Sequence, residues 1–99
     1  MKETTLAVTV VVPSLLAKVT GDRRELRVPV ENGATVAQVL DRLAADYPVF
    51  DRRVRNELGA VRRYVNLYVD GEDIRGLDGP ATRIGPGQEL LIIQSVAGG

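Results

Sequence analysis

Two short stretches near the N-terminus have the hydrophobic pattern of β-strands. Residues 6–12 are mostly apolar and β-branched, and the run stops at Pro13, which cannot donate a hydrogen bond to a neighbouring strand. In residues 25–30, Leu26, Val28 and Val30 alternate with polar or non-pairing residues, as in a half-buried strand. A polar turn at residues 20–22 separates the two, so we expect an N-terminal hairpin.

After residue 33 the period of the apolar positions changes and predicts a helix over residues 36–47. Four apolar residues fall on one face of this helix: Val36, Val39, Leu40 and Leu43. Thr35 precedes the run and Gln38 follows three residues later, which is the capping-box pattern of a helix N-terminus. Pro48 disfavours a helical conformation of the residue before it, so the helix is expected to end there.

The second half of the chain contains two further predicted strands. Residues 50–63 are charged and predict a connection, with room for one helical turn. Residues 64–69 alternate between polar and apolar side chains and end at Asp70-Gly71, a strong turn signal. Residues 76–87 are Gly-rich and irregular, and residues 89–95 form the last strand.

The resulting order is strand, strand, helix, strand, a short piece and strand. It predicts an α+β fold of the ubiquitin-like β-grasp type, with a mixed sheet of four to five strands and one main helix packed across it. The first and last strands are the most apolar, which suits central positions. Placed side by side they are parallel, with the helix in the crossover. We expect residues 1–95 to form this domain and residues 96–99 to form a flexible C-terminal tail.

Composition narrows the possible chemistry. The chain has 99 residues, 13 basic and 13 acidic side chains, and therefore no net charge that attracts nucleic acid or an anionic membrane. It has no Cys, which excludes disulfides, thiolate nucleophiles and Cys-based metal sites, and no His, the commonest general base. The longest apolar run is too short to span a bilayer. We expect a cytoplasmic protein without a bound metal.

The end of the chain points to a function. Two glycines close the sequence, and Gly is a costly residue with which to finish a structural strand. Three segments together resemble the ThiS/MoaD family of ubiquitin-like sulfur carriers, and within it the CysO type of actinobacteria: Arg63-Tyr64-Val65-Asn66-Leu67-Tyr68-Val69, Glu72-Asp73-Ile74-Arg75 and Val96-Ala97-Gly98-Gly99. The resemblance extends over essentially the whole chain.

The resemblance implies a carrier rather than an enzyme. In this family the C-terminal carboxylate, here that of Gly99, is adenylated by a ubiquitin-activating-type adenylyltransferase/sulfurtransferase and becomes a thiocarboxylate. The partner enzyme consumes the ATP, and the carrier binds no cofactor. The preceding residues thread into the partner: Gly98, Ala97 and Val96. A sulfur-accepting biosynthetic enzyme is the second partner. The CysO type favours cysteine formation, while molybdopterin, thiamin and thiosugar assembly stay open.

Two other classes of function fit the same residues. The alternative to the carrier is a ubiquitin-like protein modifier that is joined to lysines of target proteins through Gly99. The chain is also compatible with a passive interaction domain in which the glycines have no role. Isopeptide-linked adducts indicate the modifier, and normal function after removal of both glycines indicates the passive domain.

Two surface features are candidates for contact with a partner. The first is an arginine-rich segment, which suits either an acidic partner or an ordinary solvated surface: Arg52, Arg53, Arg55, Arg62 and Arg63. The second lies on the last strand, which is apolar on both faces. If Leu90 and Ile92 meet the helix, Leu91 and Ile93 lie on the open face beside Tyr68 and form a docking surface. A covering loop or the reversed register is an equal alternative.

Overall fold

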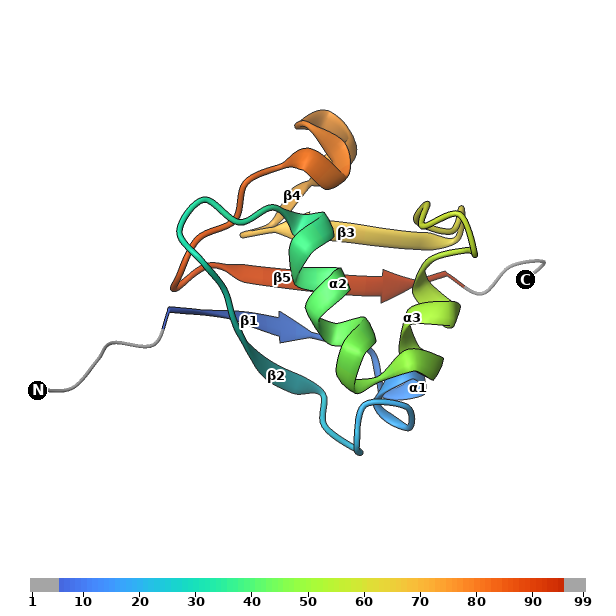
Figure 1. Ribbon diagram of the computed structural model, residues 1–99. Coiled ribbons are helices and arrows are strands. Elements are labelled where there is room, and N and C mark those ends of the chain that lie inside the picture. Colours follow the sequence, from blue (N-terminus) through green and yellow to red (C-terminus); the bar gives the residue numbers. More distant parts are fainter. Residues whose placement is uncertain (1–5, 96–99) are drawn as a thin grey trace, which may run out of the picture.

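The computed structural model describes residues 6–95, which form one mixed five-stranded sheet with the strand order β2-β1-β5-β3-β4 (Figure 1). The strands are β1 (Ala7–Val11), β2 (Glu25–Pro29), β3 (Val65–Val69), β4 (Glu72–Asp73) and β5 (Glu89–Gln94). The central pair β1 and β5 is parallel, and the other neighbours are antiparallel. The predicted β-grasp arrangement, including the central position of the first and last strands, is confirmed.

The main helix lies across one face of the sheet, as the period of its apolar residues predicts (Figure 1). It is α2 (Val36–Asp46), and its four apolar positions are all buried. The capping box is also confirmed. Thr35 Oγ1 accepts a hydrogen bond from the Gln38 N–H at 3.2 Å, and Gln38 Oε1 accepts one from the Thr35 N–H at 2.9 Å. Each side chain therefore satisfies a backbone donor that the first turn leaves free.

Two short helices differ from the sequence-based expectation. The first is α1 (Ser14–Ala17), which starts directly after Pro13 and buries Leu16 and Ala17 in a stretch for which we predicted no element. The second is α3 (Pro48–Val54), whose seven residues exceed the single turn expected in the charged connection. Pro48 ends the main helix and then occupies the first position of α3, where its missing N–H costs nothing.

The third helix is tied to the main helix by an arginine. The Arg55 guanidinium contacts Asp51 at 2.8 Å and Asp41 of α2 at 2.9 Å, and its side chain is only 10% exposed. Burial alone lowers the pKa of Arg55, but the two carboxylates raise it above the usual arginine value. Phe50 and Val54 of α3 are fully buried in the same core as the α2 residues. This helix is therefore part of the core and not a surface connection.

The turn after β3 is held to the start of β5 by one carboxylate. Asp70 and Gly71 both have positive φ angles, 48° and 88°, as the predicted tight turn requires. The Asp70 carboxylate accepts hydrogen bonds of 2.9 Å from the Gln88 side-chain amide and from the Glu89 N–H. These bonds, the Gln88 bond first, hold the pKa of Asp70 below its usual value. The remaining short elements are η1 (Ile74–Gly76) and η2 (Gly79–Ala81). Within residues 6–95, no helix has the length and apolar character needed to cross a membrane.

Candidate functional site: the end of the last strand and the open face of the sheet

The base of the predicted C-terminal tail is fixed in the sheet. The Ser95 N–H donates a 2.8 Å hydrogen bond to the Tyr64 carbonyl, so β5 stays paired with the β3 side of the sheet up to Ser95. The Asn66 side-chain amide donates to Ser95 Oγ at 3.4 Å. The predicted tail residues themselves lie outside the described residues: Val96, Ala97, Gly98 and Gly99.

The faces of β5 have the register that the docking hypothesis requires. Leu90 and Ile92 are 0% and 1% exposed and belong to the core beneath α2. Leu91 and Ile93 point the opposite way, because successive side chains of a strand alternate between faces. Ile93 is 41% exposed and Leu91 is half-buried. The reversed register is therefore excluded.

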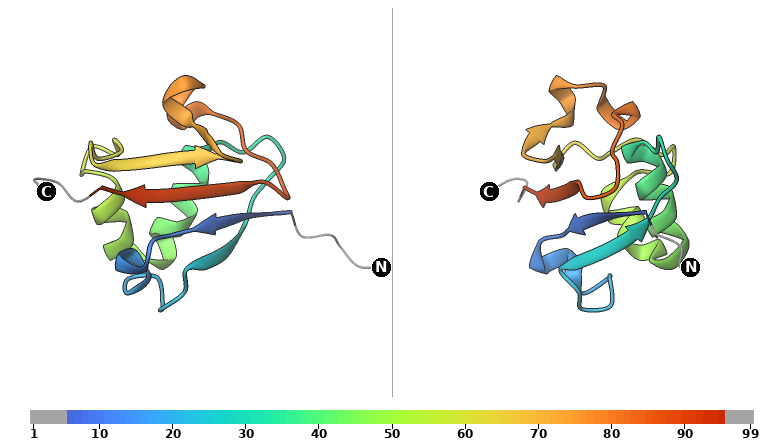
Figure 2. Two further views of the ribbon diagram at one scale, coloured as in Figure 1. Left: turned by 180° about the vertical axis from the view of Figure 1, so that it is seen from behind. Right: turned by 90° about the vertical axis from the view of Figure 1, so that its left-hand side faces the viewer.

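Four apolar side chains from three adjacent strands line up on this open face. Tyr68 of β3 is directly opposite Leu91, and Val11 of β1 pairs with Leu91 from the other side. Ile93 lies two residues further along β5, opposite Asn66. Helices α2 and α3 lie on the other face of the sheet (Figure 2). We call this group the open-face stripe: Val11, Tyr68, Leu91 and Ile93.

The arginine-rich segment divides into one structural side chain and several exposed ones. Arg55 is held by Asp41 and Asp51, a role that its i,i+4 spacing from Asp51 could have signalled. Arg52, Arg53 and Arg63 are exposed, and Arg62 is half-buried. Within residues 6–95 these four make no ion pair.

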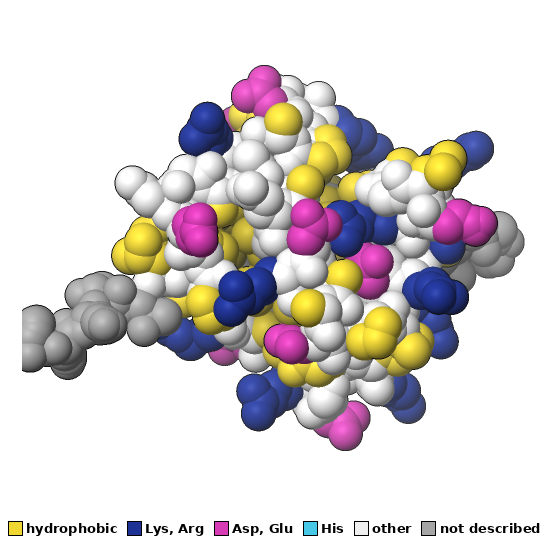
Figure 3. All heavy atoms as spheres, viewed as in Figure 1, with side chains coloured by type: hydrophobic (Ala, Val, Ile, Leu, Met, Phe, Trp, Pro, Cys, Tyr) yellow, Lys and Arg dark blue, Asp and Glu magenta, His cyan; other side chains and the backbone are white. Residues whose placement is uncertain are grey.

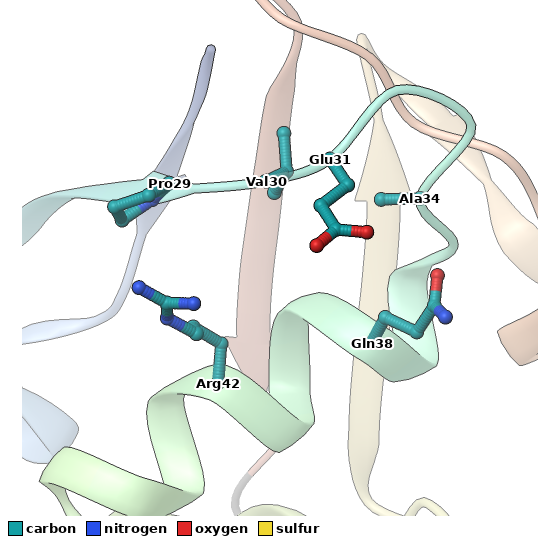
Figure 4. Close-up of a pocket in the computed structure, with 6 residues that line it drawn as sticks. All are labelled: Pro29, Val30, Glu31, Ala34, Gln38 and Arg42. Atoms are coloured by element: carbon teal, nitrogen blue, oxygen red, sulfur yellow. The ribbon is translucent and has the colours of Figure 1, made fainter. Parts of the chain in front are cut away.

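A hollow of about 340 Å³ between β2 and α2 carries no comparable signal (Figure 4). It is lined by apolar residues from the end of β2 and by exposed polar ones: Pro29, Val30, Glu31, Ala34, Gln38 and Arg42. Pro29 pairs with Ala7 at the start of β1, so the hollow lies at the end of the sheet away from Ser95. The described part of the chain also has no cluster of three or more acidic side chains that could hold a metal ion.

The comparison with protein families decides the identity of this domain. The model of the ThiS family matches residues 10–99. The chain belongs to the ThiS family. The predicted resemblance is therefore confirmed, and this ThiS-family chain has the ubiquitin-like β-grasp fold of its relatives.

Individual relatives agree with this assignment. The chain is 35% identical to the sulfur carrier protein CysO of Mycobacterium tuberculosis over 94 residues, covering 93% of this chain and 98% of the relative. It is 36% identical to small archaeal modifier protein 1 of Haloferax volcanii over 84 residues, covering 85% and 91%. The structure of the Amycolatopsis orientalis BexX/CysO complex contains a chain that matches with a TM-score of 0.78 and 33% identity, covering 94% and 100%. The ThiS-family chain is thus a small carrier or ubiquitin-like modifier.

Proposed function

We propose that this protein is a sulfur carrier whose working group is the C-terminal carboxylate of Gly99. The observation that carries the proposal is that a ThiS-family domain continues from a central, firmly paired strand into a sequence that closes with two glycines. A terminal carboxyl has a pKa of about 3.5, so it is ionised at neutral pH. The chain has no Cys, so sulfur held as a thiocarboxylate needs no thiol of the carrier.

Sulfur loading of Gly99 takes two steps, adenylation and displacement of AMP. A carboxylate oxygen of Gly99 attacks the α-phosphate of ATP, forming an acyl-adenylate and releasing pyrophosphate. Sulfide, or a persulfide of the partner enzyme, then attacks the acyl carbon and displaces AMP; the persulfide route also needs a thiol to cleave its S–S bond. The product is a thiocarboxylate, whose anionic sulfur is a nucleophile for the same reason that thiolates are. This ThiS-family chain supplies the acceptor, and the adenylating enzyme supplies the catalysis.

The glycines have a steric reason in this scheme. Without Cβ atoms, Gly98 and Gly99 can adopt backbone angles that are closed to other residues and can enter a narrow channel. Ala97 and Val96 continue the threaded segment back towards Ser95. The domain then positions the tail, and the tail carries the reacting group.

The test is a change of intact mass after ATP-dependent loading. Incubation of the purified chain with ATP, a sulfur source and its adenylating enzyme should exchange one oxygen for sulfur, and alkylation should then tag the C-terminal peptide alone. The single Met at position 1 is no reversible sulfur store. Sulfur found on any other peptide would contradict the proposal. So would an unchanged mass when the adenylating enzyme has been shown to be active.

We propose that the open-face stripe docks the adenylating enzyme. Ile93→Asp puts a charge into the stripe at a side chain that is 41% exposed. Because a buried unpaired charge is costly at an interface, we expect the KM for loading to rise about tenfold or more. Val49→Asp is the matched control, since Val49 is 53% exposed on α3, on the other side of the sheet. Equal loading kinetics for the two variants, measured at unchanged thermal stability, would rule out docking through this face.

A second function is favoured by one of the comparisons. The 36% identity to small archaeal modifier protein 1 supports conjugation through Gly99 to lysines of target proteins. The identity to CysO supports delivery of sulfur to a cysteine-forming enzyme instead. Isopeptide-linked adducts in the native host would assign the modifier role, and sulfur transfer to a small metabolite would assign the carrier role.

A further inference from the structure

The loop between α3 and β3 is held as a compact, fixed turn. The Asn56 side-chain oxygen accepts hydrogen bonds from the N–H groups of Leu58 and Ala60 at 2.9 and 3.0 Å. The Asn56 N–H donates to the Ala60 carbonyl at 2.9 Å. Gly59 has a φ of 85°, a left-handed angle that a side chain disfavours. One asparagine therefore sets the shape of the turn.

The ends of this loop are also anchored in the domain. Arg55 and Val61 form an antiparallel bridge, and the Arg62 N–H donates to the Val54 carbonyl at 2.9 Å. The Arg62 guanidinium donates to the Arg52 carbonyl at 2.8 Å. We call residues 55–63 the Leu58 loop, after the residue at its tip.

The tip of the Leu58 loop presents a large apolar side chain to solvent. Leu58 is 90% exposed, more than any other large hydrophobic residue in the part of the chain that the structure describes. Single exposed leucines are common on protein surfaces. This one differs because its backbone is already fixed by Asn56, so little conformational entropy is lost when it binds. A fixed, exposed apolar tip is the form of an anchor that inserts into a partner's pocket.

The segment that carries the tip is rich in arginine. Arg52, Arg53 and Arg63 are exposed, and residues 51–63 hold five arginines against two acidic residues, Asp51 and Glu57. The chain as a whole has equal numbers of basic and acidic side chains, so this is a local excess. Figure 3 shows several Lys and Arg side chains, with fewer acidic ones among them, along the side of the molecule on which this loop lies. A pocket that receives Leu58 would fit best with carboxylates at its rim.

The Leu58 loop shares one end of the molecule with the base of the tail. Tyr64, which follows directly after the loop, accepts the hydrogen bond from Ser95. Figure 1 and the left view of Figure 2 both place the loop at the end of the sheet where β5 stops. An enzyme that takes up the residues after Ser95 therefore approaches the end that carries the loop.

We propose that the Leu58 loop is a second docking element, which inserts Leu58 into an apolar pocket of the adenylating enzyme rimmed by acidic residues. This inference rests on the proposed function. The loop directly follows α3, which lies on the face of the sheet opposite the open-face stripe (Figure 2), so it adds contacts that the stripe does not supply. The arginines contribute mainly to the rate of association, and Leu58 contributes mainly to the lifetime of the complex.

The apolar part is tested by Leu58→Ala in the full-length chain. With the enzyme that loads the wild-type chain, we expect the KM for loading to rise about five- to tenfold, with kcat unchanged. Leu77→Ala is the matched control, because Leu77 is 40% exposed directly after η1 and undergoes the same truncation. Thermal unfolding should be the same for both variants, since neither side chain is buried. Equal KM values for the two would overturn the proposal.

The basic part is tested by the pair Arg53→Glu with Arg63→Glu. The control pair is Arg42→Glu with Arg83→Glu, which changes the total charge equally at exposed positions away from the loop. The first pair should slow association more than the control pair, and the difference should shrink as salt is raised. Equal rates of association with the enzyme for both pairs would overturn the proposal. It would also be overturned if the Arg53→Glu, Arg63→Glu pair lost only its binding to a single-stranded RNA probe. Absence of loading in the wild-type chain would instead refute the carrier function itself.

Discussion

Removal of Gly99 is expected to abolish sulfur loading while leaving the domain folded. The deletion withdraws the carboxylate by about 3.5 Å, the length of one extended residue. A misplacement of about 1 Å already costs about a hundredfold in rate when reacting groups must be held in line. Loading should therefore fall by at least that factor. The measurement is the rate at which sulfur is incorporated into the intact protein, with the adenylating enzyme that loads the wild-type chain.

Two comparisons make this experiment decisive. Replacement of Gly99 by Phe keeps the length but adds a side chain, and it should fail as well if the channel is narrow. Deletion of Met1 removes one residue from the other terminus and should leave loading unchanged. Loading at the wild-type rate without Gly99 would exclude the terminal carboxylate as the acceptor.

Phe50→Ala is expected to have the largest effect on stability. Phe50 is a residue of α3 and is fully buried in the core, and truncation of a buried Phe costs about 3–5 kcal/mol because it leaves a cavity. Urea unfolding followed by circular dichroism measures the loss. The neighbouring Val49 is 53% exposed, so Val49→Ala should stay within about 0.5 kcal/mol of the wild type. Similar losses for the two variants would mean that α3 does not pack as described.

The long, periodic elements could be predicted because their patterns are unambiguous. The main helix combines four apolar residues on one face with a capping box, and both signals agree. The strands around it follow from alternation and from turns at Pro13 and Asp70-Gly71. Their order then leaves few ways to place the crossover, so the parallel pairing of β1 and β5 followed from general rules.

The short helices could not be predicted because their stability comes from tertiary contacts. A helix of four or seven residues is not stable by itself in water. α1 forms because Leu16 fills the core, and α3 forms because Phe50 and Val54 do. Pro48 added to the difficulty, since the same residue ends one helix and begins the next. The Leu58 loop depends on hydrogen bonds of Asn56 that no periodicity reveals.

The open-face stripe could be predicted only in part. Both faces of β5 are apolar, so the pattern alone left two registers equally open. The structure chooses between them through pairing: Val10 is opposite Leu90, and both are fully buried. The exposed side chains on the other face follow from that choice.

The hydrogen bond between Ser95 and Tyr64 has a mechanical consequence. β5 is bonded to β1 on one side and β3 on the other, so a pull along the strand shears both ladders at once. The domain then acts as a stop, because the chain up to Ser95 resists being drawn out of the sheet. The depth that a terminal group can reach is counted from this bond, at about 3.5 Å for each extended residue. The sheet thereby fixes the point from which this reach is measured. Inserting or removing one residue after Ser95 changes the reach of the terminal group by the length of one residue.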